Sequence, residues 1–294
     1  ARRVRRRKKR RQRRTERRSL GRGLLRDDVD SVLLVLKLES PVNWRWRRLE
    51  LPKAGSFEGF GGKIFARSRR LERGAGDFAV SADGKHLVIG QGLHMDKDCS
   101  LMCFDAATGK QEWAVGTTLH LESSPALGEV PGVGEIAVIG AGAIEGADGL
   151  PTGNAGEVIA VQLADGKELW RAPVNDPESS PAIDADGNVY IGSGFNGNAV
   201  VALSGKTGDR LWTADTGLPM LGPITLDGDL VIAGGGNSDV VHSAANARGI
   251  VVALDKKTGK RLWTRDFSDA VLGGVALRDG IGVCGVRTGE VAAL

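Results

Sequence analysis

One phrase of about ten residues occurs four times in the chain, and this repetition constrains the fold more than any other feature. Each copy contains a glycine turn and ends in a tryptophan. The copies end at Trp113, Trp170, Trp212 and Trp263, so successive tryptophans lie 57, 42 and 51 residues apart. Such spacing is typical of repeat architectures with a unit of ~40 residues that carries insertions of varying size.

Each copy is predicted to be a pair of strands joined by a tight turn. An alternating apolar run such as Ala199-Val-Val-Ala-Leu203 has the period of a strand. A Thr-Gly or Asp-Gly pair follows, and its glycine supplies the positive φ that a tight turn requires. These glycines are Gly109, Gly166, Gly208 and Gly259. A second hairpin lies upstream, most clearly at Pro181-Ala-Ile-Asp-Ala-Asp-Gly-Asn-Val-Tyr-Ile-Gly-Ser193.

Four strands in each unit of ~40 residues form a propeller blade, so the sequence predicts an all-β propeller of four-stranded antiparallel blades. The predicted blades cover residues 77–116, 121–173, 178–216 and 219–266, and a partial fifth blade covers 270–294. A flat indole on an outer strand can fill the wedge between two twisted blades. We therefore expect the four repeated tryptophans to be core residues and not ligand-binding residues.

The repeated phrase Asp-Ala-x-Thr-Gly-Lys-x-x-Trp, with Asp-Gly-x-Val-Tyr-Ile-Gly-Ser before it, resembles the tryptophan-docking repeat of the pyrroloquinoline-quinone (PQQ)-like β-propellers. That superfamily contains quinoprotein alcohol dehydrogenases and also non-enzymatic relatives such as the outer-membrane assembly lipoprotein of the β-barrel insertion machinery. The resemblance covers about residues 77–294. It implies an eight-bladed parent and a periplasmic or cell-envelope location, although no signal peptide is visible. Because the chain begins at Ala1 and ends inside a predicted strand, we expect a fragment.

The N-terminal region differs from the repeats in composition. Residues 1–26 contain 15 Arg or Lys and one acid, whereas the remaining residues carry a net charge of −10. Such a basic arm is expected to be disordered and to bind polyanions by charge, so nucleic acid is a partner only if the arm is genuine. Residues 27–76 show no repeat, and a non-native start stays open for this segment. No apolar run approaches the ~20 residues of a membrane span.

Propeller topology places the connections between strands 2 and 3 on the same face as the segments that open each blade. These connections are long and varied in sequence, at 93–98, 143–154 and 237–248. Variable loops on a rigid scaffold are the usual place for binding, so we expect a protein partner or a small polar ligand on this loop-rich face.

Two blades open with Glu-Ser-Ser-Pro, which would place its polar side chains at the mouth of the central channel. The candidate cofactor-binding residues are therefore Glu122, Ser123, Ser124, Glu178, Ser179 and Ser180. The alternative is structural, since small residues fit an inner strand near a crowded axis.

The sequence motifs do not indicate a catalytic site. PQQ with calcium is implied by the resemblance alone and is not assigned. The adjacent cysteines and the Cys-x-x-Cys-His motif of several family dehydrogenases are lacking, and a Glu–Asn–Asp calcium set cannot be matched residue by residue. We therefore expect a non-catalytic binding scaffold with no catalytic residue. The alternative is a PQQ-dependent dehydrogenase of alcohols or sugars with part of its site outside this chain.

Metal-binding and disulfide patterns are equally sparse. None of the four histidines has zinc-site spacing, and only His94 with Asp96 and Asp98 forms a plausible local metal group. The acidic segments 184–188 and 227–229 are interpreted as Asp-Gly turns and not as calcium loops. If Cys99 and Cys103 share one strand, their Cα atoms lie ~13 Å apart, which excludes a disulfide between them.

Overall fold

The computed structural model describes residues 75–92, 97–121, 123–143, 152–153, 155–238 and 243–294. All its regular elements within these ranges are strands, which form five antiparallel sheets. The predicted all-β class and the four-stranded blades are therefore confirmed. Residues 1–74, which include the basic arm, lie outside the described residues, as do Glu122 and most of the loop 143–154.

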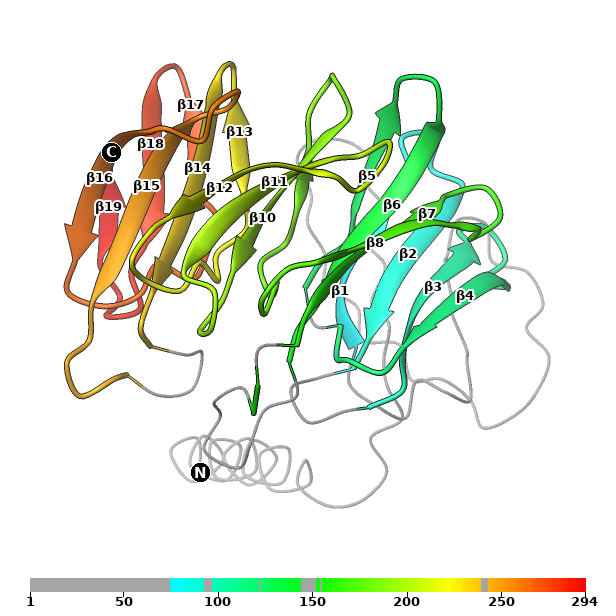
Figure 1. Cartoon of the computed structure of the whole chain (residues 1–294), viewed down its shortest axis with the longest axis horizontal. Coiled ribbons are helices and arrows are strands. Elements are labelled where there is room, and N and C mark those ends of the chain that lie inside the picture. Colours follow the sequence, from blue (N-terminus) through cyan, green and yellow to red (C-terminus); the bar gives the residue numbers. More distant parts are fainter. Residues whose placement is uncertain (1–74, 93–96, 122, 144–151, 154, 239–242) are drawn as a thin grey trace, which may run out of the picture. The chain divides into compact units, whose positions relative to one another are not determined.

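Each sheet is formed by strands that follow one another in the chain (Figure 1). The first contains β1 (Ala75–Val80), β2 (His86–Gln91), β3 (Cys99–Asp105) and β4 (Gln111–Thr117). The second contains β5 (Ala126–Val130), β6 (Gly134–Ala141), β7 (Glu157–Gln162) and β8 (Glu168–Pro173). The third contains β9 (Ala182–Ile183), β10 (Asn188–Ser193), β11 (Ala199–Ser204) and β12 (Arg210–Asp215).

The fourth sheet contains β13 (Thr225–Asp227), β14 (Leu230–Gly236), β15 (Gly249–Asp255) and β16 (Arg261–Phe267). The fifth has three described strands, β17 (Ala276–Arg278), β18 (Ile281–Gly285) and β19 (Val291–Ala293). No helix of the described residues is long and apolar enough to cross a bilayer.

The core consists of apolar layers between consecutive sheets. Neighbouring residues of β6 show the arrangement, because Ile139 packs with the first sheet and Val138 packs with the third. Successive side chains of a strand point to opposite faces, so a middle strand that is covered on both sides must be apolar throughout. This requirement explains the unbroken apolar runs of the second and third strands.

Cys99 and Cys103 both lie on β3, as the disulfide argument assumed, and all three cysteines are thiols. All three contribute to the apolar layers, Cys99 and Cys103 between the first and second sheets and Cys284 between the fourth and fifth. They behave there as small hydrophobic residues.

Three of the repeated tryptophans join their sheet to the next one. The indole Nε1 of Trp113 donates a hydrogen bond to Leu163 O at 2.8 Å, that of Trp170 to Gly205 O at 2.7 Å, and that of Trp212 to Lys256 O at 3.0 Å. Each acceptor lies at the turn between strands 3 and 4 of the following sheet. The wedge between sheets is thus closed by a directional bond as well as by packing.

The glycine of each of the three turns that accept an indole hydrogen bond packs against the indole ring. A Cβ on Gly166 would lie 2.6 Å from the ring of Trp113, and one on Gly259 would lie 2.6 Å from the ring of Trp212. Both glycines also have positive φ, 71° and 69°. The turn therefore requires glycine for its backbone conformation and again for the close approach of the indole.

Trp263 departs from the expectation that all four tryptophans are core residues, because it is 38 % exposed. The other three indoles are covered by the turn that leads into a fourth strand. The described part of the fifth sheet has no fourth strand, so no such turn covers Trp263.

This difference supplies a matched pair of variants. We expect Trp170→Ala to lower the free energy of unfolding by about 3–5 kcal/mol, because it empties a buried site between two sheets. Trp263→Ala should cost less, roughly 1–2 kcal/mol, since its side chain is already partly solvated. Urea unfolding followed by circular dichroism measures both, and equal losses would contradict the docking role of the covered indoles.

Candidate functional site

The segments that open the second to fifth sheets form the candidate site, and we call 118–125, 174–181, 216–224 and 268–275 the opening segments. Each lies between the second strands of the two sheets that it joins. In 216–224, Met220 N donates to Ser193 O of β10 at 3.1 Å, and Pro219 O accepts from Gly236 N of β14 at 2.9 Å. These contacts place the opening segments at the end of the sheets that also carries the strand 2–3 connections.

Glycine in the second strands makes this close approach possible. A Cβ on Gly140 of β6 would lie 1.9 Å from Pro177 O, and one on Gly235 of β14 would lie 2.0 Å from Pro219 O. No side chain can occupy these positions unless the opening segment moves away. The glycines therefore fix how near the opening segments come to the inner ends of the sheets.

The opening segments differ in their ionisable side chains. Alignment on Glu-Ser-Ser-Pro places His120 and Asp176 at one shared position, two residues before Glu122 and Glu178. The later segments carry apolar residues where the glutamates stand, Met220 and Val271, and both are fully buried. Among the described residues, the two later segments thus keep one ionisable side chain, Asp269.

His120 and Glu178 join two consecutive opening segments. His120 Nε2 lies 3.4 Å from Glu178 Oε1, and the exposed fractions of the two side chains are 0 % and 6 %. Two glycines leave space for them, since a Cβ on Gly142 would lie 2.7 Å from His120 Nε2 and one on Gly194 would lie 3.1 Å from Glu178 Oε2. A buried pair of this kind fixes the distance between the two segments. Removing one partner would leave the other buried without its compensating group, which destabilises the fold.

Asp176 is buried beside this pair. Its Oδ1 accepts from Ala143 N at 3.2 Å and its Oδ2 accepts from Phe195 N at 2.9 Å, so it holds the start of two strand 2–3 connections. Burial raises the pKa of Asp176 above its usual value, although these hydrogen bonds and the nearby His120 and Glu178 oppose the shift.

Asp269 occupies the corresponding place in the last opening segment, but its charge is better compensated. Its Oδ2 accepts from Ser243 Oγ at 2.7 Å and lies 3.7 Å from Arg287 Nη1, and its Oδ1 accepts from Ala270 N at 2.8 Å. Burial alone would raise the pKa of Asp269. Hydrogen bonds from Ser238, Ser243 and the Ala270 amide, together with Arg287, outweigh burial and hold the pKa below its usual value.

The predicted serines contact the backbone of neighbouring segments. Ser179 Oγ accepts from Gly192 N at 2.6 Å, and Ser180 Oγ accepts from Ser124 N at 3.1 Å. Ser123 is buried, while Glu122 lies outside the described residues. The structure thus brings Ser124 to Ser180 and Glu178 to His120, in contacts that favour the structural alternative for the serines.

The described opening segments do not fit PQQ. This cofactor carries three carboxylates, which proteins bind with Arg, Lys and N–H donors. The described ionisable side chains of these segments are His120, Asp176, Glu178 and Asp269, so acids predominate there. Arg287, which lies nearby, already pairs with Asp269.

The other candidates of the sequence analysis are turns or lie outside the described residues. Asp184 Oδ1 accepts from Asp186 N at 3.0 Å and from Asn188 N at 2.8 Å, which makes segment 184–188 a turn closed by its own aspartate. His94 and Asp96 lie outside the described residues, so the predicted local metal group stays a prediction.

His120, Asp176 and the Asp269 cluster are functional candidates that the motifs did not predict. For His120 and Asp176 a signal exists, because the Glu-Ser-Ser-Pro motifs align them. The Asp269 cluster has no local signal, since Ser243, Asp269 and Arg287 come from three separate segments of the chain.

Comparisons with known proteins agree with this architecture. The family described as outer membrane protein assembly factor BamB matches residues 154–269. The outer membrane protein assembly factor BamB of Xanthomonas campestris pv. campestris is 31 % identical over 143 residues, which cover 45 % of this chain and 32 % of that protein. The quinohemoprotein alcohol dehydrogenase ADH IIB of Pseudomonas putida is 33 % identical over 126 residues, 36 % of this chain and 17 % of that protein.

The chain therefore spans about a third or less of these relatives. Among solved structures, the Kuenenia stuttgartiensis hydrazine synthase superposes with a TM-score of 0.53 at 17 % identity, over 78 % of this chain and 60 % of that chain, which shows a likeness of fold alone. The sheets and their opening segments define a β-propeller repeat protein. Its repeats are of the PQQ-like type, as the repeated phrase predicts.

The two buried aspartates should give opposite pH dependences of stability. The lowered pKa of Asp269 stabilises the fold above the pKa of the unfolded chain, and this contribution is lost as the pH falls through the folded pKa. For Asp176 the pKa is raised, so its contribution is present below the unfolded pKa and is lost as the pH rises through the folded pKa.

Asp269→Asn should therefore cost more stability at neutral pH than at acid pH, and Asp176→Asn should cost more at acid pH. Urea unfolding of both variants and the parent chain at the two pH values measures these differences. The same pH trend in both variants would contradict the assigned environments.

Proposed function

We propose that the chain is a non-catalytic propeller scaffold of the cell envelope that binds a protein partner through its loop-rich face. The similarity to an outer membrane protein assembly factor over residues 154–269 supports the class of function and the location. The observation that carries the choice of face is the hydrogen bonding that fixes its loops to one another.

Loops of neighbouring sheets are joined directly. Asn196 Nδ2, in the strand 2–3 connection of the third sheet, donates to Gly153 O in that of the second sheet at 2.7 Å. Asn175 Nδ2, in the opening segment, donates to Asn196 O at 3.4 Å. The buried Asp176 holds the bases of the same two loops. The described parts of these two loops are therefore held against each other by hydrogen bonds.

The described ends of the loop of the fourth sheet are held together by hydrogen bonds within the loop. Asn237 Oδ1 accepts from Arg248 N at 2.7 Å, and Ser238 Oγ accepts from Ala244 N at 3.0 Å. Ser243 contacts Asp269 below it, while Ala245 and Asn246 are exposed. A surface that is ordered before binding loses less conformational entropy when a partner docks.

The opposite face repeats one turn. Thr108 N donates to Asp105 Oδ1 at 2.6 Å in the first sheet, and Thr258 N donates to Asp255 Oδ1 at 2.8 Å in the fourth. These bonds lower the pKa of both aspartates, through the threonine hydroxyl first and its amide second. The same turn recurs on this face. A partner therefore finds fewer distinctive features there than on the face with the varied loops.

Site-specific photocrosslinking tests the choice of face. We expect a photoreactive amino acid at Ala245 or Asn246 to give covalent adducts with one discrete protein in the native host. The matched controls are the exposed hairpin positions Lys206 and Lys257, which should give none of that adduct. Adducts of equal yield from both faces, or from the hairpin positions alone, would contradict the proposal.

The alternative, a PQQ-dependent dehydrogenase with part of its site outside this chain, makes a different prediction for the full-length protein. PQQ with calcium would raise the melting temperature by mass action, and an alcohol or sugar would then reduce an electron-accepting dye. The scaffold proposal predicts neither result. Saturable binding with turnover would replace it.

A further inference from the structure

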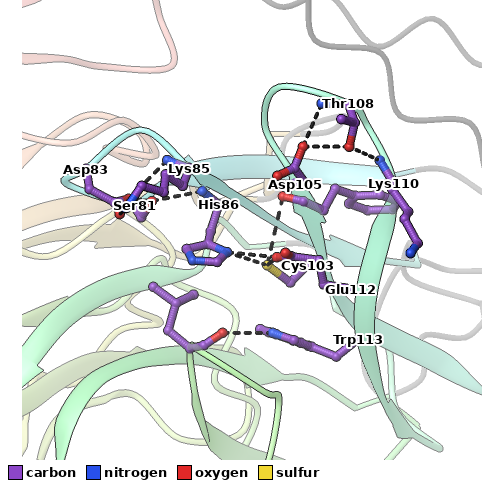
Figure 2. Close-up of polar contacts among 12 residues, drawn as sticks. Ser81, Asp83, Lys85, His86, Cys103, Asp105, Thr108, Lys110, Glu112 and Trp113 are labelled. Carbon is purple, nitrogen blue, oxygen red and sulfur yellow. Dashed lines mark hydrogen bonds and ion pairs between the residues drawn. The ribbon is translucent and has the colours of Figure 1, made fainter.

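Three metal-ligating side chains meet on adjacent strands of the first sheet, far along the strands from the opening segments. His86 begins β2, Cys103 lies on β3 and Glu112 lies on β4, and Figure 2 shows their side chains turned toward one another. His86 Nδ1 lies 2.8 Å from Glu112 Oε2, and Cys103 Sγ lies 3.5 Å from Glu112 Oε2 and 3.8 Å from His86 Nδ1. All three ligand atoms fall within 4.8 Å of one another.

A β-bulge brings Glu112 into this group. Cys103 pairs with Trp113 and Phe104 pairs with Gln111, so Glu112 is the extra residue of β4 with no partner in the ladder. Strict alternation would place Glu112 on the face opposite Trp113. The bulge relaxes that alternation, and the carboxylate reaches the thiol of β3 and the imidazole of β2.

The other sheets show what the fold itself requires at these positions. Each of the three has the same bulge, and its extra residue is Leu169, Leu211 or Leu262. The residue paired with the tryptophan, which corresponds to Cys103, is Ala160, Ala202 or Ala253. The positions that correspond to His86 hold Ile136, Asn188 and Leu230.

The same backbone thus forms with aliphatic, alanine or amide side chains at all three positions. Packing does not call for an imidazole, a thiol and a carboxylate, and only the first of the four-stranded sheets has all three. One repeat thus carries three metal-ligating side chains where the others carry no imidazole, thiol or carboxylate. This difference is the observation that indicates a bound ion.

The donor set suits a divalent metal of the zinc class. Zn²⁺ takes imidazole nitrogen, thiolate and carboxylate at about 2.0–2.3 Å, so ligand atoms around a tetrahedral ion lie roughly 3.3–3.8 Å apart. The two distances to Cys103 Sγ already have this length. Only the hydrogen bond between His86 and Glu112 has to open, by about 0.5 Å.

The surroundings leave a path for the ion. Cys103 is buried, whereas the His86 and Glu112 side chains are 24 % and 33 % exposed. Solvent therefore reaches two of the three ligands, and a water molecule can complete the tetrahedron. When the ion binds, the Cys103 thiol proton passes to solvent, and His86 binds through Nδ1 as the neutral tautomer that carries its proton on Nε2, as ligation by thiolate and neutral imidazole requires.

We propose that His86, Cys103 and Glu112 form a site for one Zn²⁺-class ion, which links three strands of the first sheet and keeps one coordination position open. The site is independent of the proposed partner-binding face, because it lies near the hairpin ends of the strands. It can therefore be tested whatever the outcome of the crosslinking.

Metal titration of the full chain provides the test. We expect one equivalent of Zn²⁺ to bind and to raise the melting temperature by mass action. Co²⁺ should bind in its place and give the near-ultraviolet charge-transfer band of a cobalt–thiolate bond. Both signals should saturate at the same stoichiometry.

The repeats supply the variants, because each new residue already occupies the same position in another sheet. Cys103→Ala should abolish the cobalt–thiolate band, and Glu112→Leu and His86→Asn should each weaken Zn²⁺ binding by at least about tenfold. Far-ultraviolet circular dichroism shows whether each variant folds. If Cys103→Ala does not fold, the other two variants decide, since both keep the thiol.

Two control variants separate this site from other ligands of the chain. Cys284→Ala removes a different buried thiol, and His94→Ala removes the histidine of the predicted local metal group. Both should leave the stoichiometry and the band unchanged. Loss of binding in either control, a band that survives Cys103→Ala, equal affinity in Glu112→Leu, or no saturable binding would overturn the proposal.

Discussion

The docking of an indole on a glycine turn is the interaction on which the rest of this structure depends. A twisted sheet packed on another leaves a wedge at its outer edge, and the tryptophan of one sheet closes that wedge against the next. The hydrogen bond from Nε1 to a turn carbonyl fixes the direction of the contact as well as its depth. Each sheet is therefore oriented by its neighbour, and the opening segments between the second strands take their positions from that orientation.

The two ends of the sheets follow different rules as a result. At the hairpin end the turn must accept an indole, so its sequence repeats with little change. At the other end the strand 2–3 connections do not have to accept an indole, and they vary in length and in charge. Buried ionisable groups accumulate there: His120 and Glu178 join consecutive opening segments, and Asp176 holds the start of two strand 2–3 connections. The variable end can thus carry recognition without disturbing the contacts that hold the sheets together.

The fold could be predicted from the sequence because it repeats. Four copies of one phrase define the hairpins, and the apolar runs define strands that are covered on both faces. Trp263 escaped the prediction, since its exposure depends on a covering turn and not on its own sequence. His86, Cys103 and Glu112 escaped for another reason. Their proximity arises from cross-strand register and a bulge, whereas sequence motifs detect ligands that are close along the chain.

The β-bulge before each tryptophan has a consequence for how such proteins diversify. It frees one side chain per sheet from the alternation that otherwise assigns every strand residue to a packed face. Selection can therefore alter that residue and its two cross-strand neighbours while the backbone stays the same. In a propeller built from these repeats, every bulge brings three side chains of adjacent strands together. Each such group can acquire new chemistry through a few point mutations without an insertion.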